Sequence, residues 1–527
     1  MDKLKLGVGD FLAEAVDAHP TAPFLIWAPD GSVLSYQEFQ QRADRAAAVW
    51  HELGVRAGDR VSFMVDNRPE FLIAWFGLAK VGGVLVAINT GFGAQEATYL
   101  VQDSSSKLAL VDNRYLEIFD RVAESVPTLR ESLPVDPTEG RRSFTELMAT
   151  EESTAPAVSV GADDIISLIY TSGTTGRPKG VMQTHGNYVL TGQAYPHWMG
   201  MDRGDRIYAC LPLFHINSQA YSTMGAIGAG GALVLSPRFS AQGFWRDVRT
   251  FEVNVFNFIG AMTVILSKKE EAADDADNVV KVAYGVPALP PEVKKVVEVR
   301  FGLQVLSGFG MSETTFGLVE PIQGPHKPGS MGVPRNHPDP SVPRTEARIA
   351  DEHGHDVANG AHGELLIRNA AMMKGYFNDP ERTADALDAS GWLHTGDTAW
   401  RDDDGYFFFV DRKKDIVRRR GENVSSLELE RVIDEHPDVL ESAVVGVPSE
   451  LTDEDILVYV VVREGRAVKP PEIVAWCQER LASFKIPRYI EMIDALPKTP
   501  TSKIEKHRLR QRPTDPGRFD REAGRAR

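Results

Sequence analysis

The chain has 527 residues, of which 43% are hydrophobic and 25% are charged, and these proportions are typical of a globular protein with at least two domains. Its 58 basic and 74 acidic residues give a net charge of −16, which argues against non-specific binding to nucleic acid. Cys210 and Cys477 are the only cysteines, which excludes a disulfide framework or a cysteine-based zinc site and favours a reducing, cytoplasmic compartment.

The N-terminal part alternates between helical and extended patterns. Residues 10–55 have mostly helical spacing around an extended segment at 24–27. Residues 131–161 are rich in Pro, Glu, Thr and Ser, which predicts an excursion over the surface. We expect an α/β sheet with helices on its faces, built from helices at 69–80 and 93–103 and strands at 61–65, 84–88 and 107–112.

An apolar run at residues 71–88 is long enough to resemble a membrane span. Lys80 lies inside this run, and Gly82 and Gly83 interrupt it. A buried helix followed by a buried strand is therefore the preferred interpretation, and we expect no membrane span.

A dense run of hydroxyl and glycine residues separates two predicted strands, at 165–169 and 181–185. The run reads Thr171-Ser-Gly-Thr-Thr-Gly-Arg-Pro-Lys179-Gly180. Glycines let backbone N–H groups approach an anion, and the hydroxyl groups and Lys179 add further donors, so the run suits a polyphosphate. A Walker A loop needs Gly-Lys followed by Ser or Thr, and this run fails that template, while a flexible surface turn remains the simpler alternative.

This loop resembles the signature of the adenylate-forming superfamily, which includes acyl-CoA synthetases, adenylation domains of peptide synthetases and beetle luciferases. The resemblance implies that ATP is bound by the loop and by three later motifs, described next. It also implies a large N-terminal α/β domain with a smaller β subdomain, followed by a small, mobile α+β domain. The loop residues implied in ATP or AMP binding are Thr171, Ser172, Gly173, Thr174, Thr175, Gly176 and Lys179.

Two motifs after the loop are implied to form the acyl pocket and one face of the adenine site. Phe214 and His215 match the Pro-x-Phe-His found at the mouth of the carboxylate pocket in acyl- and aryl-CoA ligases, although a strand-end turn is an equal alternative. This segment lacks the Asp of amino-acid-activating domains, which argues against an α-amino acid substrate. Tyr284 adds to the pocket, and Gly285-Val286-Pro287 matches the segment that covers adenine in the family.

The segment Gly308-Phe309-Gly310-Met311-Ser312-Glu313 is similar to the family motif Tyr-Gly-x-Thr-Glu. Phe309 keeps an aromatic face for adenine, and Ser312 keeps a hydroxyl group for the α-phosphate. The resemblance implies that Glu313 is catalytic and holds Mg²⁺, with Thr171 as a second metal ligand; carboxylate and phosphate oxygens are the ligands that Mg²⁺ prefers.

Asp397 and Arg412 match the family residues that bind the ribose, and Lys414 matches the hinge between the domains. We therefore expect an N-terminal domain at 1–412 and a mobile C-terminal domain at 413–510. Residues 511–527, rich in Arg, Pro, Asp and Gly, are predicted to form a disordered tail.

After the hinge, Arg420, Gly421 and Glu422 are implied to bind coenzyme A, and Gly-Glu-Asn-Val-Ser is most similar to the crotonobetaine/carnitine-CoA ligase branch. Lys503 matches the lysine that bridges the substrate carboxylate and the ATP phosphates. Ser502 stands where the family usually has Gly, and a backbone conformation with positive φ there would carry a strain of about 1–3 kcal/mol.

Together, the motifs imply a ligase that uses ATP and Mg²⁺ to form an acyl-adenylate and then transfers the acyl group to the thiol of coenzyme A. Lys503, Glu313 and Lys179 would be the catalytic residues. Alternatives are transfer to a carrier-protein thiol, specialisation for one half-reaction, and a catalytically silent nucleotide-binding protein. Aromatic residues near the pocket favour a bulky or cyclic acid; the oligomeric state is left open, with a dimer as one candidate.

Overall fold

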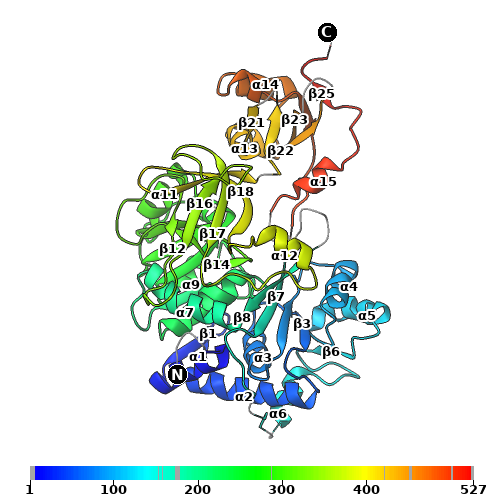
Figure 1. Ribbon diagram of the computed structural model, residues 1–527, viewed down its shortest axis with the longest axis vertical. Coiled ribbons are helices and arrows are strands. Elements are labelled where there is room, and N and C mark those ends of the chain that lie inside the picture. The colour runs from blue at the N-terminus through cyan, green and yellow to red at the C-terminus, as the bar shows by residue number, and fades with distance from the viewer. Residues whose placement is uncertain are drawn as a thin grey trace.

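The computed structural model describes residues 6–151, 154–156, 158–171, 178–286, 288–412, 414–419, 422–449, 454–499 and 503–523. The chain forms a large domain and, above it in Figure 1, a smaller C-terminal domain. This arrangement confirms the predicted large α/β domain followed by a small α+β domain.

The first sheet of the large domain has six strands in the order β6-β5-β3-β4-β7-β8. All neighbouring pairs are parallel except β7 and β8, which form the predicted antiparallel hairpin. The strands are β3 (Arg60–Met64), β4 (Val84–Ala87), β5 (Leu108–Val111), β6 (Glu131–Pro134), β7 (Ile165–Thr171) and β8 (Lys179–Thr184). Helices α3 (Pro69–Lys80), α4 (Ala94–Asp103) and α5 (Leu116–Ser125) connect them.

The apolar run at 71–88 therefore forms helix α3 and strand β4, as predicted. Helix α3 is buried along almost its whole length, and a Cβ atom at Gly77 would lie 2.5 Å from the Cβ atom of Ala46, because α2 (Tyr36–Glu52) packs closely on it. Within the described ranges, no helix is long and apolar enough to cross a membrane. The predicted surface excursion at 131–161 is instead partly regular, since it contains β6 and α6 (Phe144–Thr150).

The second sheet has thirteen strands and changes character at β13. From β1 to β13 the order β1-β10-β9-β11-β12-β13 is parallel, and from β13 onward β14-β15-β19-β18-β17-β16 is antiparallel. The antiparallel half is the predicted β subdomain. The strands are β1 (Pro23–Trp27), β2 (Ser32–Ser35), β9 (Arg206–Ala209), β10 (Ala232–Leu235), β11 (Val255–Ile259), β12 (Val282–Val286), β13 (Gln304–Met311), β14 (Thr314–Val319), β15 (Ser330–Pro334), β16 (Glu346–Ala350), β17 (Gly363–Arg368), β18 (Leu393–Arg401) and β19 (Phe407–Arg412).

One large apolar core joins the two sheets and runs along α7 (His185–Trp198), which is buried on most of its surface. A second core, which contains Phe256, Phe258 and Met262, is a separate cluster. The remaining helices of the large domain are α1 (Val8–Ala18), α8 (Met224–Gly228), α9 (Phe244–Thr250), α10 (Gly260–Ser267), α11 (Pro291–Phe301) and α12 (Pro380–Ala386).

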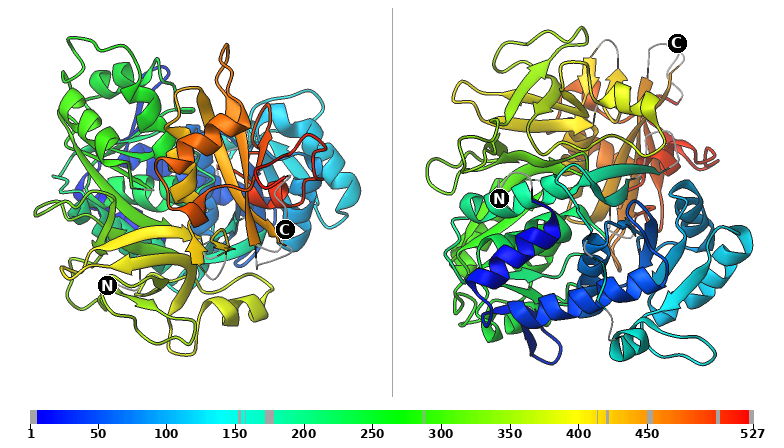
Figure 2. Two further views of the ribbon diagram at one scale, coloured as in Figure 1. Left: turned by 90° about the horizontal axis from the view of Figure 1, so that it is seen from above. Right: turned by 60° about the horizontal axis from the view of Figure 1, so that its bottom comes forward.

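The C-terminal domain is built on a four-stranded sheet in the order β22-β23-β24-β25, with apolar clusters that use alternate residues of its strands. Figure 2, seen from above, shows this domain lying over the large domain, between the yellow strands of the β subdomain and the cyan α4–α5 region. Its elements are β20 (Val417–Arg419), β21 (Glu422–Val424), α13 (Ser426–Asp434), β22 (Val439–Pro448), β23 (Glu454–Val462), α14 (Pro470–Gln478), β24 (Tyr489–Met492), α15 (Lys506–Arg510) and β25 (Phe519–Asp520).

The prediction of a disordered tail from residue 511 is wrong for residues 511–523. Strand β25 pairs with β24, and Phe519 lies opposite Ile490 in this pair. Arg518 forms an ion pair of 2.6 Å with Glu491. The polar composition of the tail hid this strand, because a single apolar residue and a few ion pairs hold it to the sheet.

Candidate active site

The predicted phosphate loop joins β7 to β8 at the edge of the first sheet. Thr171 lies opposite Lys179 in the hairpin. The hydroxyl oxygen of Thr171 is buried and makes no hydrogen bond within the described residues, so it is available to a ligand. The predicted residues Ser172, Gly173, Thr174, Thr175 and Gly176 lie outside the described residues.

Lys179, Glu313 and Tyr376 form a compact cluster beside this loop. Lys179 Nζ lies 3.1 Å from Glu313 Oε1, and the Tyr376 hydroxyl group donates a hydrogen bond of 2.8 Å to the same oxygen. Lys179 Nζ also contacts the Tyr376 hydroxyl group and lies 4.0 Å from the ring centroid. Glu313 is only 4% exposed. The cluster holds a carboxylate and an ammonium group in fixed positions at the start of β8.

Sequence analysis missed Tyr376, which lies in the loop after β17. A bridge between Val181 and Tyr376 places this loop against β8, although the two residues are far apart in sequence. Desolvation and the Glu313 carboxylate raise the pKa of Tyr376, which keeps its hydroxyl group protonated as a donor. A lone tyrosine in an irregular loop carries no sequence signal for such a role.

Two amide side chains, also missed, fix the turn that carries Ser312 and Glu313. Gln183 Nε2 donates a hydrogen bond to the Ser312 carbonyl oxygen. Asn187 Nδ2 donates to Gln183 Oε1 at 2.8 Å and to the Met372 carbonyl oxygen at 2.9 Å. The turn between β13 and β14 is thereby tied to β8, α7 and the Tyr376 loop.

Asp397 and Arg412 face each other on the paired strands β18 and β19. Arg412 Nε lies 2.7 Å from Asp397 Oδ1 in an ion pair, yet neither Asp397 oxygen accepts a directed hydrogen bond from the described residues. Asp397 is fully buried, and burial raises its pKa to about 6, against the opposing effects of Arg412 and Lys503. Its carboxylate is therefore a buried acceptor with free lone pairs.

Lys503 comes from the C-terminal domain and lies close enough to the Asp397–Arg412 pair for their charges to interact. Its side chain reaches solvent, but partial desolvation lowers its pKa, and the cations Arg412 and Lys414 lower it further, whereas Asp397 raises it. Glu313 also contributes to the raised pKa of Asp397, so the Lys179 cluster lies nearby. Residues 179, 313, 397, 412 and 503, distant in sequence, thus gather in one region. Ser502 lies outside the described residues.

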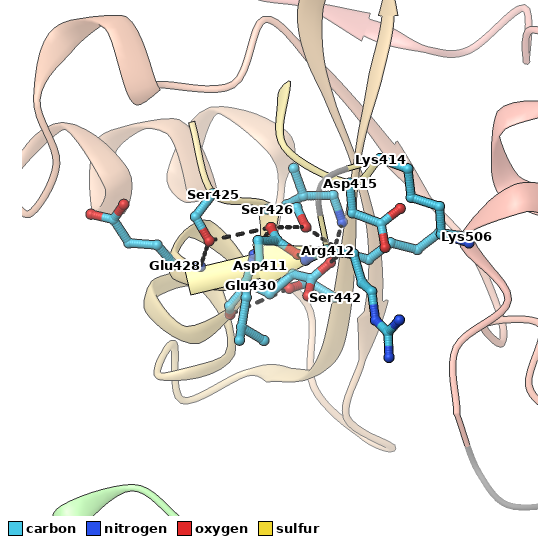
Figure 3. A network of polar contacts seen from close by, with 12 residues as sticks. Asp411, Arg412, Lys414, Asp415, Ser425, Ser426, Glu428, Glu430, Ser442 and Lys506 are labelled. Atoms are coloured by element: carbon cyan, nitrogen blue, oxygen red, sulfur yellow. Dashed lines mark hydrogen bonds and ion pairs between the residues drawn. The ribbon is translucent and has the colours of Figure 1, made fainter. Parts of the chain in front are cut away.

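A polar network surrounds the predicted hinge (Figure 3). Asp411 Oδ2 accepts hydrogen bonds from the Ser426 hydroxyl group at 2.7 Å and from the Leu427 amide at 3.2 Å. Ser425 caps helix α13 by accepting from the Glu428 amide at 3.2 Å. The last strand of the large domain is thereby bound to the first long helix of the small domain.

Two basic residues of α15 complete this network from the other side. Lys506 Nζ lies 2.7 Å from Glu430 Oε1, and Arg510 donates a hydrogen bond of 3.1 Å to the Lys414 carbonyl oxygen. Lys414 itself is exposed.

The predicted acyl-pocket residues lie at the end of β9 and on β12. The Phe214 and His215 rings are 4.7 Å apart, and burial lowers the pKa of His215 to about 4, so its imidazole is neutral. His215 Nε2 has no hydrogen-bond partner among the described residues. Tyr284 is buried against Tyr221, which belongs to a π-helical segment, η3 (Asn217–Thr223).

Other predicted residues are located less completely. Gly285 and Val286 end strand β12, and Pro287 lies outside the described residues. Phe309 is 8% exposed and packs with Leu318 and Met331. Of the residues predicted to bind coenzyme A, Glu422 begins β21, while Arg420 and Gly421 lie outside the described residues.

Comparisons with known proteins agree with this geometry. The model of the AMP-binding enzyme family matches residues 12–377, and that of the AMP-binding enzyme C-terminal domain matches residues 428–503. The crotonobetaine/carnitine–CoA ligase of Escherichia coli strain UTI89 is 35% identical over 522 residues, which cover 95% of this chain and 98% of the relative.

Solved structures of ligases share the fold. ATP-bound MatB from Rhodopseudomonas palustris is 26% identical with a TM-score of 0.86, over 96% of this chain and 99% of that one. A benzoate CoA ligase from Burkholderia xenovorans LB400 is 25% identical with a TM-score of 0.84, over 96% of this chain and 100% of that one.

The fold and the site together define an enzyme of the adenylate-forming class. The chain belongs to the AMP-binding enzyme family, and its similarity to named CoA ligases extends through both domains.

Proposed function

We propose that this protein is an ATP-dependent acid–CoA ligase that converts a carboxylic acid, ATP and coenzyme A into an acyl-CoA, AMP and pyrophosphate. The observation that carries this proposal is the position of Lys503. A lysine of the C-terminal domain approaches the Asp397–Arg412 pair of the large domain, next to the Lys179–Glu313 cluster. Such a set can hold two anions together, as adenylation requires.

In the first step, a carboxylate oxygen of the acid attacks the α-phosphorus of ATP, and the bond to the pyrophosphate oxygen breaks. Lys503 offsets the repulsion between the carboxylate and the phosphates, and Lys179 holds the departing pyrophosphate. Asp397 and Arg412 hold the ribose, Ser312 contacts the α-phosphate, and residues 285, 286 and 308–311 border adenine.

The residues present fit a magnesium ion. The buried, unpartnered Thr171 hydroxyl oxygen and the Glu313 carboxylate would hold it together with phosphate oxygens, and the ion would neutralise phosphate charge. Within the described ranges no group of three His, Cys, Asp or Glu side chains could hold a metal by itself, which is consistent with a site completed by the nucleotide.

In the second step, the thiolate of coenzyme A attacks the acyl carbon of the adenylate and displaces AMP. Rotation of the small domain about Lys414 would withdraw Lys503 and bring residues 420–422 to the site. Strand β19, which ends at residue 412, belongs to the large sheet, whereas β22–β25 form a separate sheet. This separation supports a domain boundary near residue 412.

The proposed reaction is tested in two assays. Pyrophosphate exchange into ATP that depends on an added carboxylic acid tests the first step, and loss of free thiol from added coenzyme A tests the second. Exchange without thiol consumption would instead favour an enzyme that serves a carrier protein or performs one half-reaction. The absence of exchange with every acid would favour a silent nucleotide-binding protein.

We also propose the kind of acid that is activated, the cellular compartment and the assembly. The aromatic residues Tyr221 and Tyr284 border the acyl pocket and are consistent with a bulky or cyclic acid, whereas Phe256 and Phe258 belong to the separate core. The net charge of −16 and the two unpaired cysteines fit the cytoplasm, with a dimer as a candidate assembly.

We expect Tyr376→Phe to reduce acid-dependent pyrophosphate exchange about tenfold, because a hydrogen bond to a charged group is worth roughly 1.5 kcal/mol or more. Without the hydroxyl group, Glu313 and Lys179 lose their common partner. The matched control is Tyr406→Phe, since Lys327 lies 4.8 Å from that ring, away from the site. Equal losses in both variants would show that Tyr376 has only a structural role.

We expect Lys414→Pro to keep adenylate formation and to slow thioester formation about tenfold, because proline fixes φ at a residue that must rotate. The Lys414 amide donates no hydrogen bond within the described part of the chain, so proline removes none. Lys414→Ala is the control, and an unchanged melting temperature would show that the turn closed by the Asp415 amide and the Arg412 carbonyl oxygen is intact. Normal thioester formation in Lys414→Pro would refute the rotation.

A further inference from the structure

Arg335, directly after strand β15, carries a buried charge that has no acidic partner among the described residues. Its side chain is 1% exposed, and its Nε atom donates a hydrogen bond of 2.9 Å to the Leu318 carbonyl oxygen. The Nη1 and Nη2 atoms donate no well-directed hydrogen bond to any described residue, and the Tyr221 hydroxyl group is the polar side-chain group that interacts with them. A buried guanidinium group without an anion is costly, so a partner that the protein alone does not supply is expected.

Aromatic rings surround the Arg335 guanidinium group instead of carboxylates. Its central carbon lies 4.7 Å from the Tyr284 ring centroid and 5.3 Å from those of Trp198 and Tyr221. Ring faces attract the positive charge, but they do not accept the in-plane N–H groups as an oxygen does. Burial lowers the pKa of Arg335, partly offset by Tyr221, and an arginine remains charged even so.

The rings of Trp198, Tyr221 and Tyr284 form the Arg335 cage. This cage lies against strand β13, which leads to the reaction site. A Cβ atom at Gly308 would lie 2.7 Å from Arg335 Nη2 and 2.8 Å from Tyr284 Cε2. A Cβ atom at Gly310 would lie 3.0 Å from the Tyr221 hydroxyl oxygen. The Arg335 cage and the motif that ends in Ser312 and Glu313 are therefore neighbours along strand β13, next to the proposed acyl pocket.

We propose that Arg335 binds a second anionic group of the substrate, so that the acid activated by this protein is a dicarboxylic acid. The inference rests on the proposed ligase function and narrows its substrate class. The two oxygens of a second carboxylate would accept one hydrogen bond from Nη1 and one from Nη2 in a bidentate pair. An apolar acyl chain would leave those groups unsatisfied, and an acid with a quaternary ammonium group, such as carnitine, would meet a like charge.

The length of β13 limits the size of the acid. The four residue-to-residue steps of extended chain from 308 to 312 span at most about 14 Å. The acid must fit between Arg335 at one end and the α-phosphate site near Ser312 at the other, and part of that span belongs to the adenylate linkage. Diacids of about four to eight carbons are therefore the appropriate probes.

The test compares each diacid with the monoacid of equal length in acid-dependent pyrophosphate release by the full chain. The pairs are succinate and butyrate, adipate and hexanoate, suberate and octanoate, and terephthalate and benzoate, with carnitine as the cationic probe. We expect at least one diacid to exceed its monoacid by about 30-fold or more in kcat/KM, the loss that follows removal of one partner of a buried charge pair.

The Arg335→Met variant keeps an apolar side chain of similar length but removes the positive charge. The preference for a diacid over its monoacid should therefore disappear in this variant. Arg348→Met is the matched control, because Arg348 lies 4.8 Å from the Trp392 ring, on a different strand, and should keep it. A preference that persists in Arg335→Met would overturn the assignment.

The wild-type panel decides the matter even if Arg335→Met does not fold. Monoacids or carnitine used as well as or better than every diacid would overturn the role of Arg335 and leave the ligase function intact. No pyrophosphate release with any acid would refute the ligase function itself. As a second readout on wild type, succinate, adipate or suberate with ATP should raise the melting temperature more than the matching monoacid, and the reverse order would contradict the proposal.

Discussion

Lys503→Ala should reduce acid-dependent pyrophosphate exchange by about three orders of magnitude. At about 4 Å and an effective dielectric constant of about 20, one charge pair is worth roughly 4 kcal/mol, which corresponds to about 1000-fold in rate. Lys503 is the cation that the small domain brings to the Asp397–Arg412 pair. The measurement is exchange of labelled pyrophosphate into ATP at a saturating concentration of the best acid.

The same variant should form the thioester from supplied acyl-adenylate at a near-normal rate, because Lys503 is proposed to leave the site for that step. Lys498→Ala is the matched control, since Lys498 lies on the same segment but pairs with Glu441 of the small domain. Equal loss of both half-reactions in Lys503→Ala would contradict the proposal that Lys503 acts in adenylate formation and leaves the site before thioester formation. A large loss in Lys498→Ala would indicate that the segment is perturbed as a whole.

The motifs predicted the parts of the site that lie in continuous segments. The hairpin around the phosphate loop is visible from the alternation of its strands, and Asp397 and Arg412 are visible from their flanking motifs. The structure adds that these two residues are opposite each other on β18 and β19. Each of these features depends on local sequence, and local sequence determines turns and strand pairs of this kind.

The residues that sequence analysis missed depend on contacts between distant segments. Tyr376 reaches Glu313 from another loop, and Arg335 meets Tyr221 and Tyr284 only because β13, β15 and η3 pack together. Nothing in the sequence around Arg335 distinguishes a buried, unpaired arginine from the many exposed ones. The ordered tail was missed for a related reason, since Arg518 finds Glu491 only in the folded sheet.

Asp397→Ala should raise KM for ATP about 100-fold, because the ribose hydroxyl groups lose a charged acceptor and each such hydrogen bond is worth roughly 1.5–3 kcal/mol. The loss leaves Arg412 without its buried partner, which adds to the effect. Asp402→Ala is the matched control, since Asp402 follows the same strand but pairs with Lys327. A similar change of KM in both variants would indicate a general disturbance of this hairpin and not a ribose contact.

The pH dependence of wild type gives an independent test of Asp397. Its pKa is raised to about 6, so the carboxylate form is complete only above that pH, and kcat/KM for ATP should fall as the pH decreases through about 6. Glu313 opposes ionisation of Asp397, while Arg412 and Lys503 favour it, so Lys503→Ala should move this inflection to higher pH. Asp397→Asn cannot titrate and should lose the inflection altogether. An inflection that persists unchanged in Asp397→Asn would assign it to another group and remove the support for a buried, ionisable ribose ligand.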